Sequence, residues 1–238
     1  MKWFKSFLLL LLFLPSRTLF TRCSYAWYWR RDHSQYHLLA KQMILQEAPE
    51  LLTTIPRDNK NYKPDYAEIS EEARLEFWGM FLSAISWMES SHRKEHCYEE
   101  RGITDSTGEN VISRGLLQFS FESARGYLPS LETPEQLHIP EVTLRIGAIA
   151  LKRFIIGDQV ISQGSKGNWR GAARYWSVLR RNEKHPQIQK WLVEGDYCDP
   201  RNNLIPPPPH VTKDDYEPWI MRFFNKLKSP ADAQPTEN

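Results

Sequence analysis

The feature that most constrains this chain is an apolar stripe that ends in a carboxylate. Its members recur at three- and four-residue spacing, which predicts one helix with all of them on the same face. We expect this helix to begin near Asp65 or Ser70 and to end at about His92; Asp65 with Glu68 has the form of a capping box. The stripe consists of Leu75, Trp78, Leu82, Ile85 and Glu89.

Glu89 carries the chemistry of this stripe, because a carboxylate is seldom placed on an apolar face without a reason. Burial and the negative end of a helix both disfavour the charged form, so we expect a raised pKa for Glu89. A carboxylic acid that stays protonated near neutral pH can act as a general acid. The alternative is that Glu89 turns off the helix end into water or pairs with Arg93.

Two motifs together resemble a known family. Glu89-Ser90 ends the apolar helix, and Gly-Leu-Leu-Gln-Phe-Ser follows at residues 115–120. This combination resembles the core of the soluble lytic transglycosylases and goose-type lysozymes, over residues 70–180. The resemblance implies that Glu89 is the catalytic acid, and that Ser90, Gln118 and Phe119 belong to a saccharide cleft.

A third motif is a partial match. The transglycosylases carry Ala-Ala-Tyr-Asn-Ala-Gly, with the Tyr directed at the catalytic Glu. Tyr175 fits that position, whereas Trp176 replaces the usual Asn and Ser177 the usual Ala. The resemblance therefore implies that Tyr175 is a partner of Glu89; the alternative is a core tyrosine on an amphipathic helix.

The expected fold class is all-α, a lysozyme-like helical domain over residues 27–228 with almost no strand. Residues 93–114 are rich in charge and in turn formers and are predicted to be a loop. The tail 229–238 is polar and expected to be disordered. Other predicted helices cover residues 27–48, 140–156, 169–179 and 212–227, with a short one after a capping Ser120.

The N-terminus predicts export to the periplasm or cell envelope, or secretion. Lys2 and Lys5 precede an apolar run over residues 7–14, which is the form of a signal segment within residues 1–26. The run is shorter than the about 20 residues of a spanning helix. An uncleaved N-terminal membrane anchor remains an alternative, while a lipid-modified Cys23 fits poorly after Arg22.

The cysteines offer one candidate disulfide. In an exported chain Cys97 and Cys198 could tie the loop after the Glu89 helix to a C-terminal segment; the alternative is two unrelated thiols. Cys97 with His92 and His96 lacks a second Cys/His cluster, so we expect no metal site. No organic cofactor is implied either.

The composition of the chain limits the kinds of binding partner that we expect. The net charge is only +2, so no strong field favours nucleic acid. Aromatic residues make up 13% of the chain, which suits a groove that stacks on sugar rings, although most rings in such a chain are core. The expected partner is the glycan strand of peptidoglycan, and the oligomeric state stays open.

Three functions follow from these residues. The resemblance implies first a lytic transglycosylase, in which Glu89 alone cuts the MurNAc–GlcNAc bond and leaves 1,6-anhydromuramoyl ends. A lysozyme-type muramidase needs a second carboxylate, for which Glu109 or Asp105 is available; either could be a solvated loop acid. A non-catalytic cell-wall-binding scaffold is the third. A weaker idea is an assembly factor whose partner recognises Pro206–Pro209.

Overall fold

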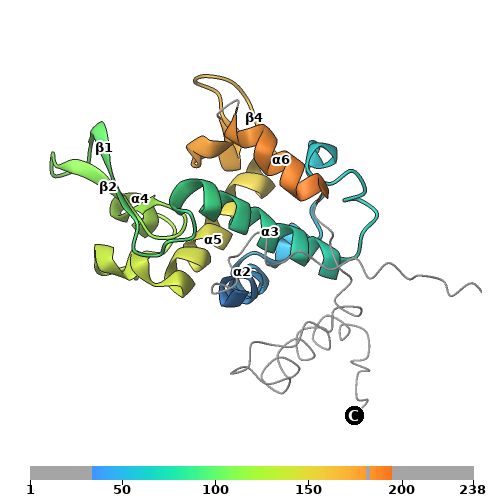
Figure 1. Cartoon of the computed structure of the whole chain (residues 1–238), viewed down its shortest axis with the longest axis horizontal. Helices are drawn as coiled ribbons and strands as arrows, with labels where there is room; N and C mark the ends of the chain where they lie inside the picture. Colours follow the sequence, from blue (N-terminus) through green and yellow to red (C-terminus); the bar gives the residue numbers. More distant parts are fainter. Residues whose placement is uncertain (1–33, 181–182, 195–238) are drawn as a thin grey trace, which may run out of the picture. The chain divides into compact units, whose positions relative to one another are not determined.

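The central element of the protein is helix α3, Glu71–Ser90. The computed structural model describes residues 34–180 and 183–194 (Figure 1). Ser70 is the N-cap of α3, and its hydroxyl accepts a hydrogen bond from the Ala73 amide at 3.3 Å. The helix therefore starts at the second of the two predicted positions, and the capping box at Asp65 does not form.

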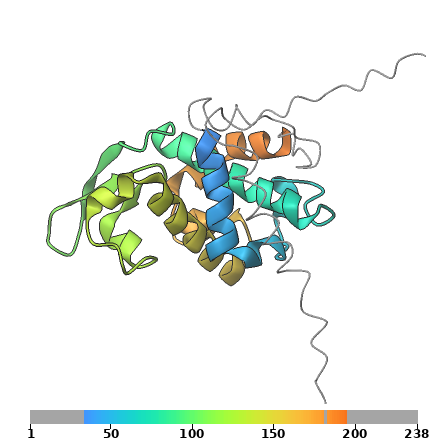
Figure 2. The same ribbon diagram turned by 90° about the horizontal axis from the view of Figure 1, so that it is seen from below.

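Helix α3 is buried on every side along its middle. All residues from Leu75 to Ser86 are buried, so the four apolar residues of the predicted stripe lie in a fully enclosed segment, whereas Glu89 lies beyond it and is half-exposed. The burial includes Glu76, which makes ion pairs with two side chains of α2 (Ser34–Glu47). Helix α2 lies across α3 and α5 (Pro140–Asp158) in Figure 2.

Helix α5 approaches the rest of the core closely at one glycine. A Cβ at Gly147 would lie 2.4 Å from the Leu117 side chain and 3.3 Å from that of Leu82. The small residue therefore lets helix α5 lie close to both the Leu117 segment and α3. Helix α5 itself matches the prediction for residues 140–156 within two residues.

Residues 97–120 form a three-stranded antiparallel sheet in the order β1-β2-β3, so the prediction of a loop with almost no strand is wrong there. The β1–β2 hairpin extends away from the helices (Figure 1). Its longest strand has an exposed or half-exposed side chain at every position, which leaves no alternation of buried and exposed residues in the sequence. The strands are β1 Cys97–Thr104, β2 Asn110–Arg114 and β3 Phe119–Ser120.

Ser120 ends the sheet and begins the next helix. Its hydroxyl accepts a hydrogen bond from the Ser123 amide at 3.2 Å, which caps the short helix α4, Phe121–Arg125, as predicted. A 3-10 helix, η4 (Pro134–His138), then leads into α5.

The segment 169–179 is not the α-helix that its apolar pattern predicts. Gly171 has a positive φ of 61°, and a Cβ there would lie 2.4 Å from the Ile161 carbonyl oxygen, so strand pairing replaces the first helical turn. The segment contains strand β5 (Arg170–Gly171), paired with β4 (Ser162–Gln163), and two 3-10 turns. These turns are η5 Ala172–Arg174 and η6 Ser177–Leu179, and α6 Lys184–Glu194 follows.

The connection from α2 to α3 packs on this second sheet. It contains two 3-10 turns, η2 Pro49–Leu52 and η3 Asn59–Asn61. Asp58 accepts hydrogen bonds from the amides of Ile161 at 2.6 Å and Ser162 at 3.0 Å. The carboxylate thus fixes β4 to a segment about a hundred residues earlier.

Two compact units divide the chain, Met1–Cys198 and Asp199–Asn238, and all described residues belong to the first. That unit is mainly helical with two small sheets. In the part of the chain that the structure describes, no helix is long and apolar enough to cross a bilayer. The expectations outside this part concern the export segment 1–26, the helix at 212–227, Pro206–Pro209, the tail 229–238 and Cys198.

Candidate functional site

The end of α3 is held in an unusual backbone conformation directly after Glu89. Ser91 and His92 both have positive φ, at 52° and 59°, and the Ser91 amide donates to the carbonyls of Ser86 and Trp87. Two successive left-handed residues are costly outside glycine. They stop the helix at once and leave Glu89 half-exposed in its last turn.

Buried His92 holds this turn in place. Its Nδ1 lies 3.0 Å from the Ser86 hydroxyl, and its ring packs against the Trp87 indole with centroids 5.4 Å apart. These contacts hold His92 against the last turns of α3. The site around Glu89 is therefore rigid at its base.

Ser90 joins the two halves of the sequence motif. Its buried hydroxyl lies 2.9 Å from the Leu116 carbonyl oxygen and 3.0 Å from that of Ser86, and it shares its one proton between them. The residue beside Glu89 is thereby fixed to the Gly115–Phe119 segment. The resemblance implied that these two segments belong to one site, and this hydrogen bond joins them.

Gln118 is also buried and has a positive φ of 50°. Its Nε2 donates to the carbonyls of Gly115 at 2.7 Å and His96 at 3.1 Å, so it closes the turn that carries it. Its Oε1 is buried and accepts no hydrogen bond from any described residue. This side chain, predicted to line a saccharide cleft, is used in part to shape the turn.

Tyr175 also holds the turn that carries Gln118. Its hydroxyl donates to the Gln118 carbonyl at 3.3 Å and accepts from the Ser120 amide at 3.2 Å. The Phe119 ring is buried against it, with centroids 4.6 Å apart. Burial raises the pKa of Tyr175 far above its ordinary value. Phe119 and Tyr175 thus form the support of the Gln118 turn.

Trp176 stands where the resembled family has Asn, and the structure gives this departure a role. The indole is buried, and its Nε1 donates to the Leu117 carbonyl at 3.1 Å. Tyr175 and Trp176, which lie between η5 and η6, therefore bind the consecutive carbonyls of Gln118 and Leu117.

Two cationic side chains that the sequence analysis did not identify lie near the end of α3. Lys184, the first residue of α6, donates to the Met88 carbonyl at 3.0 Å, which suits the negative end of a helix. Arg180 lies close enough to Glu89 for their charges to interact. The local cluster of basic residues from Arg174 to Lys184 is the signal that could have indicated them.

The two loop acids predicted as alternatives lie at the tip of the β1–β2 hairpin. Asp105 accepts from the Thr107 hydroxyl at 2.6 Å and amide at 2.8 Å, and from the Glu109 amide at 3.2 Å. The Thr107 hydrogen bonds lower the pKa of Asp105. Asp105 is therefore occupied in the turn, and the Glu109 side chain is exposed.

Glu100 is a further acid of the hairpin, and the sequence analysis did not name it. It is the half-buried residue of a strand whose other residues are exposed, including Tyr98 and Ile103. Its Oε1 accepts from the Ser113 hydroxyl on β2 at 3.1 Å. Apolar side chains are usually buried and carboxylates exposed, and strand β1 does the reverse.

Cys97 is exposed and is a free thiol among the described residues, and its candidate disulfide partner Cys198 lies outside them. Its sulfur lies 3.7 Å from His138 Nε2 and 3.8 Å from the Glu95 carbonyl. Within residues 34–180 and 183–194, no group of three or more His, Cys, Asp or Glu side chains is placed to hold a metal ion.

No protein-family model matches the chain, and no curated protein matches it. Solved structures do. The wild-type DslA (Bd0314) structure is 33% identical with a TM-score of 0.66, over 71% of this chain and 93% of that one. Two DslA variants, each with one glutamate replaced by glutamine, are similar at 32% identity.

The mainly helical domain, with a carboxylate in the last turn of its central helix, is consistent with a lysozyme-like or lytic-transglycosylase-type fold. The extent of the likeness allows a narrower assignment. The chain belongs to the same protein family as DslA.

Proposed function

We propose that this protein is a peptidoglycan lytic transglycosylase in which Glu89 is the general acid and base. The observation that carries the proposal is the Ser90 hydroxyl bond to the Leu116 carbonyl, which unites the Glu-Ser motif with the Gln118 turn. A carboxylate in a rigid, strained setting beside a conformationally fixed turn is the arrangement expected of a catalytic acid.

The proposed reaction needs one carboxyl group. Glu89 gives its proton to the oxygen that links C1 of N-acetylmuramic acid to N-acetylglucosamine, and the C1–O bond breaks. Arg180 stabilises the carboxylate that remains, because their charges interact. Glu89 then takes the proton of the muramoyl 6-hydroxyl as O6 bonds to C1, which gives the anhydro sugar and restores the acid.

Hydrolysis is the second candidate function, and the position of Glu100 in the hairpin favours it. Hydrolysis uses a water in place of the 6-hydroxyl and a second carboxylate to activate it. The glutamates replaced in the two DslA variants lie eleven positions apart in that protein, and Glu89 and Glu100 have the same separation. We therefore take Glu100, rather than Asp105 or Glu109, as the base in this alternative.

The deciding experiment is mass spectrometry of the fragments that the purified full-length protein releases from peptidoglycan sacculi. Anhydromuramoyl ends that persist in Glu100→Gln and vanish in Glu89→Gln support the transglycosylase. Reducing muramoyl ends that vanish in both variants establish the hydrolase. Glycan binding without any release, in the wild type as in Glu89→Gln, would leave a cell-wall-binding scaffold.

The proposed substrate lies outside the cytoplasmic membrane, so the proposal includes export through the N-terminal segment. Cell fractionation of the producing bacterium should then find the protein in the envelope or the medium. Recovery in the cytoplasm alone would contradict this part of the proposal.

A further inference from the structure

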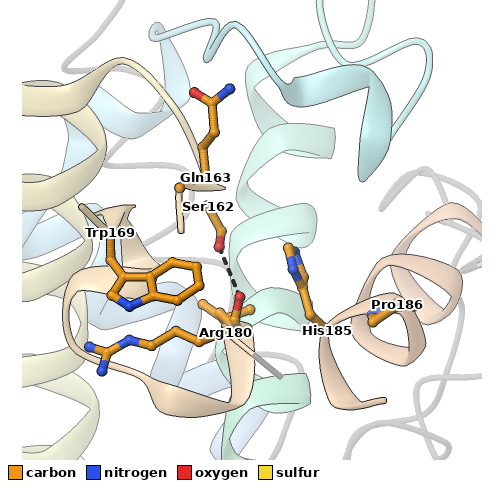
Figure 3. Close-up of a pocket in the computed structure, with 8 residues that line it drawn as sticks. Ser162, Gln163, Trp169, Arg180, His185 and Pro186 are labelled. Carbon is orange, nitrogen blue, oxygen red and sulfur yellow. Dashed lines mark hydrogen bonds between the residues drawn. The ribbon is translucent and has the colours of Figure 1, made fainter. Parts of the chain in front are cut away.

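A pocket with a volume of about 330 Å³ lies between β4 and the start of α6 (Figure 3). This volume is at the lower end of the range of small-molecule sites, about 300–1,000 Å³, and suits a single ring rather than a long ligand. In Figure 3 the indole of Trp169 and the imidazole of His185 stand on opposite sides of the pocket.

Trp169 provides an aromatic face. It is half-exposed at the end of the polar turn that precedes β5. No hydrogen bond joins its indole N–H to any described residue, in contrast to the buried indole of Trp176. A flat apolar face with a free polar edge is suited to the C–H face and the hydroxyl groups of a pyranose.

Arg180 provides a fixed cation. Its Nε donates to the Ala173 carbonyl, and its Nη2 donates to the carbonyls of Arg174 and Tyr175. The guanidinium carbon lies 5.9 Å from the Trp169 ring centroid. Nη1 has no acceptor among the described residues, so part of the guanidinium fork is available to a ligand.

The surroundings of Arg180 increase its value as an anion ligand. Burial lowers its pKa, while Glu89 opposes that change, so the guanidinium is partly dehydrated and stays charged. An oriented, weakly hydrated guanidinium pairs well with a carboxylate, because both groups are planar and bidentate contact is possible.

His185 closes the opposite side without adding charge. Its Nε2 lies 2.6 Å from the Tyr62 hydroxyl, and the two rings stack with centroids 5.8 Å apart. Burial lowers the pKa of His185, which keeps the ring neutral near pH 7. Arg180 is therefore the charged group among the residues that line the pocket.

We propose that this pocket is a saccharide subsite that binds an amino-sugar ring carrying a carboxylate, with the ring on Trp169 and the carboxylate on Arg180. This inference rests on the proposed function and specifies its substrate. The coupling of Arg180 to Glu89, and the hydrogen bond from Lys184 to Met88, connect the pocket to the end of α3. The carboxylate is either the lactyl group of a muramoyl unit or a carboxylate of its peptide stem.

Binding to small probes tests the subsite apart from cleavage. Isothermal titration calorimetry of the full-length protein would use chitotetraose, the peptide-free disaccharide GlcNAc–MurNAc, and the same disaccharide with a dipeptide stem. Trp169→Ala should weaken all three by about tenfold, since it removes the stacking face. Arg180→Gln should weaken the acidic probes by about tenfold and leave chitotetraose within about twofold.

Two further variants keep the test clear. Arg170→Gln removes an exposed arginine next to Trp169 in sequence and should change no affinity. Arg180→Lys keeps the charge without the fork and should recover part of the loss, which a merely misfolded Arg180→Gln protein would not explain. A loss confined to the stem-bearing probe assigns the carboxylate to the peptide. A loss confined to the peptide-free disaccharide assigns it to the lactyl group, because the stem is joined to that carboxyl as an amide. A loss on both probes shows that Arg180 binds a carboxylate at either position.

Unchanged affinities in Trp169→Ala and Arg180→Gln, or an equal loss in Arg170→Gln, would overturn the subsite. If Trp169→Ala cuts sacculi normally with an unchanged KM, the proposed function survives and the subsite does not. If the probes bind as expected but sacculi are not cut, the subsite survives and the proposed function does not.

Discussion

At the scale of single residues, backbone strain gathers around the candidate site. Ser91, His92 and Gln118 are three of the four non-glycine residues with positive φ in the described ranges. Each costs about 1–3 kcal/mol and persists only because the surroundings enforce it. The enforcing contacts are those of the His92 ring and of the Tyr175 hydroxyl, so the strain is a property of the tertiary structure.

The first prediction concerns Ser90→Ala. The substitution removes the hydroxyl that joins the end of α3 to the Leu116 carbonyl and leaves that buried carbonyl without this donor. We expect a loss of about 1–3 kcal/mol in the free energy of unfolding, measured by urea denaturation. Release of fragments from sacculi should fall by more than the stability loss explains, because Glu89 would no longer be positioned against the turn.

Ser130→Ala is the matched control, since Ser130 is an exposed loop residue. It should leave both stability and activity unchanged. Equal behaviour of the two variants would mean that the Ser90 bond does not position the site.

At the scale of elements, the contact of α5 with the Gln118 turn depends on one glycine. A Cβ at Gly147 meets the Leu117 side chain, whereas one at Gly157, in the last turns of the same helix, meets nothing within 4 Å. We expect Gly147→Ala to destabilise the protein by about 1–3 kcal/mol through overpacking. Gly157→Ala should stabilise it by about 0.5–1 kcal/mol through helix propensity.

Thermal unfolding by circular dichroism measures both changes on one scale. Because Leu117 belongs to the Gln118 turn, Gly147→Ala should also reduce fragment release at a temperature where it is folded. Stabilisation by both substitutions would show that the helix and the turn are separated by more space than the structure has.

The β1–β2 hairpin supports a prediction that separates its acids. Asp105→Ala removes the acceptor that organises the tip, so the amides of residues 105–109 should exchange their hydrogens faster. Fragment release should stay at the wild-type level, because this carboxylate is occupied in the turn. Glu109→Gln, a change of an exposed side chain, should alter neither measurement; loss of activity in either variant would reinstate that acid as a candidate base.

At the scale of the whole molecule, the sequence predicted the parts that depend on local periodicity. Helix α5 and the Ser120 cap follow from spacing and capping chemistry, whereas the proximity of Ser90 to the 115–119 segment was implied by the family resemblance. The hairpin was missed because β1 has no buried alternate residue to produce a period of two. The helix predicted over 169–179 fails because Gly171 and Trp176 satisfy contacts with residues ten to sixty positions away.

The role of Glu76 could not be predicted from local spacing either, because its partners lie about forty residues earlier in the chain. His37 Nε2 lies 2.8 Å from Glu76 Oε2, and the Lys41 ammonium donates to Glu76 Oε1. Burial alone would raise the pKa of Glu76, but Lys41 and His37 outweigh it and lower the pKa to about 2. A buried, paired carboxylate thus joins α2 to the centre of α3.

The sign of the resulting pH dependence follows from this lowered pKa. A carboxyl that binds its proton more weakly in the folded state contributes stability above its ordinary pKa of 4.5, and loses that contribution as the pH falls toward 2. Glu76→Gln should lower the free energy of unfolding at pH 7 by about 3–5 kcal/mol, because it leaves the largely buried Lys41 ammonium without its anion and weakens the hydrogen bond to His37. The difference from the wild type should shrink between pH 4.5 and pH 2.

Urea denaturation at a series of pH values measures this difference directly. Glu47→Gln, at the end of α2, is the control: Glu47 pairs with the exposed Arg145 at 2.7 Å, and its loss should cost no more than about 1 kcal/mol. A Glu76→Gln deficit that is the same at pH 3 as at pH 7 would mean that the carboxylate charge does not stabilise the contact of α2 with α3. A stability difference that disappears at low pH would show that the cluster of Glu76 with Lys41 and His37 stabilises the contact of α2 with α3 and is lost in acid.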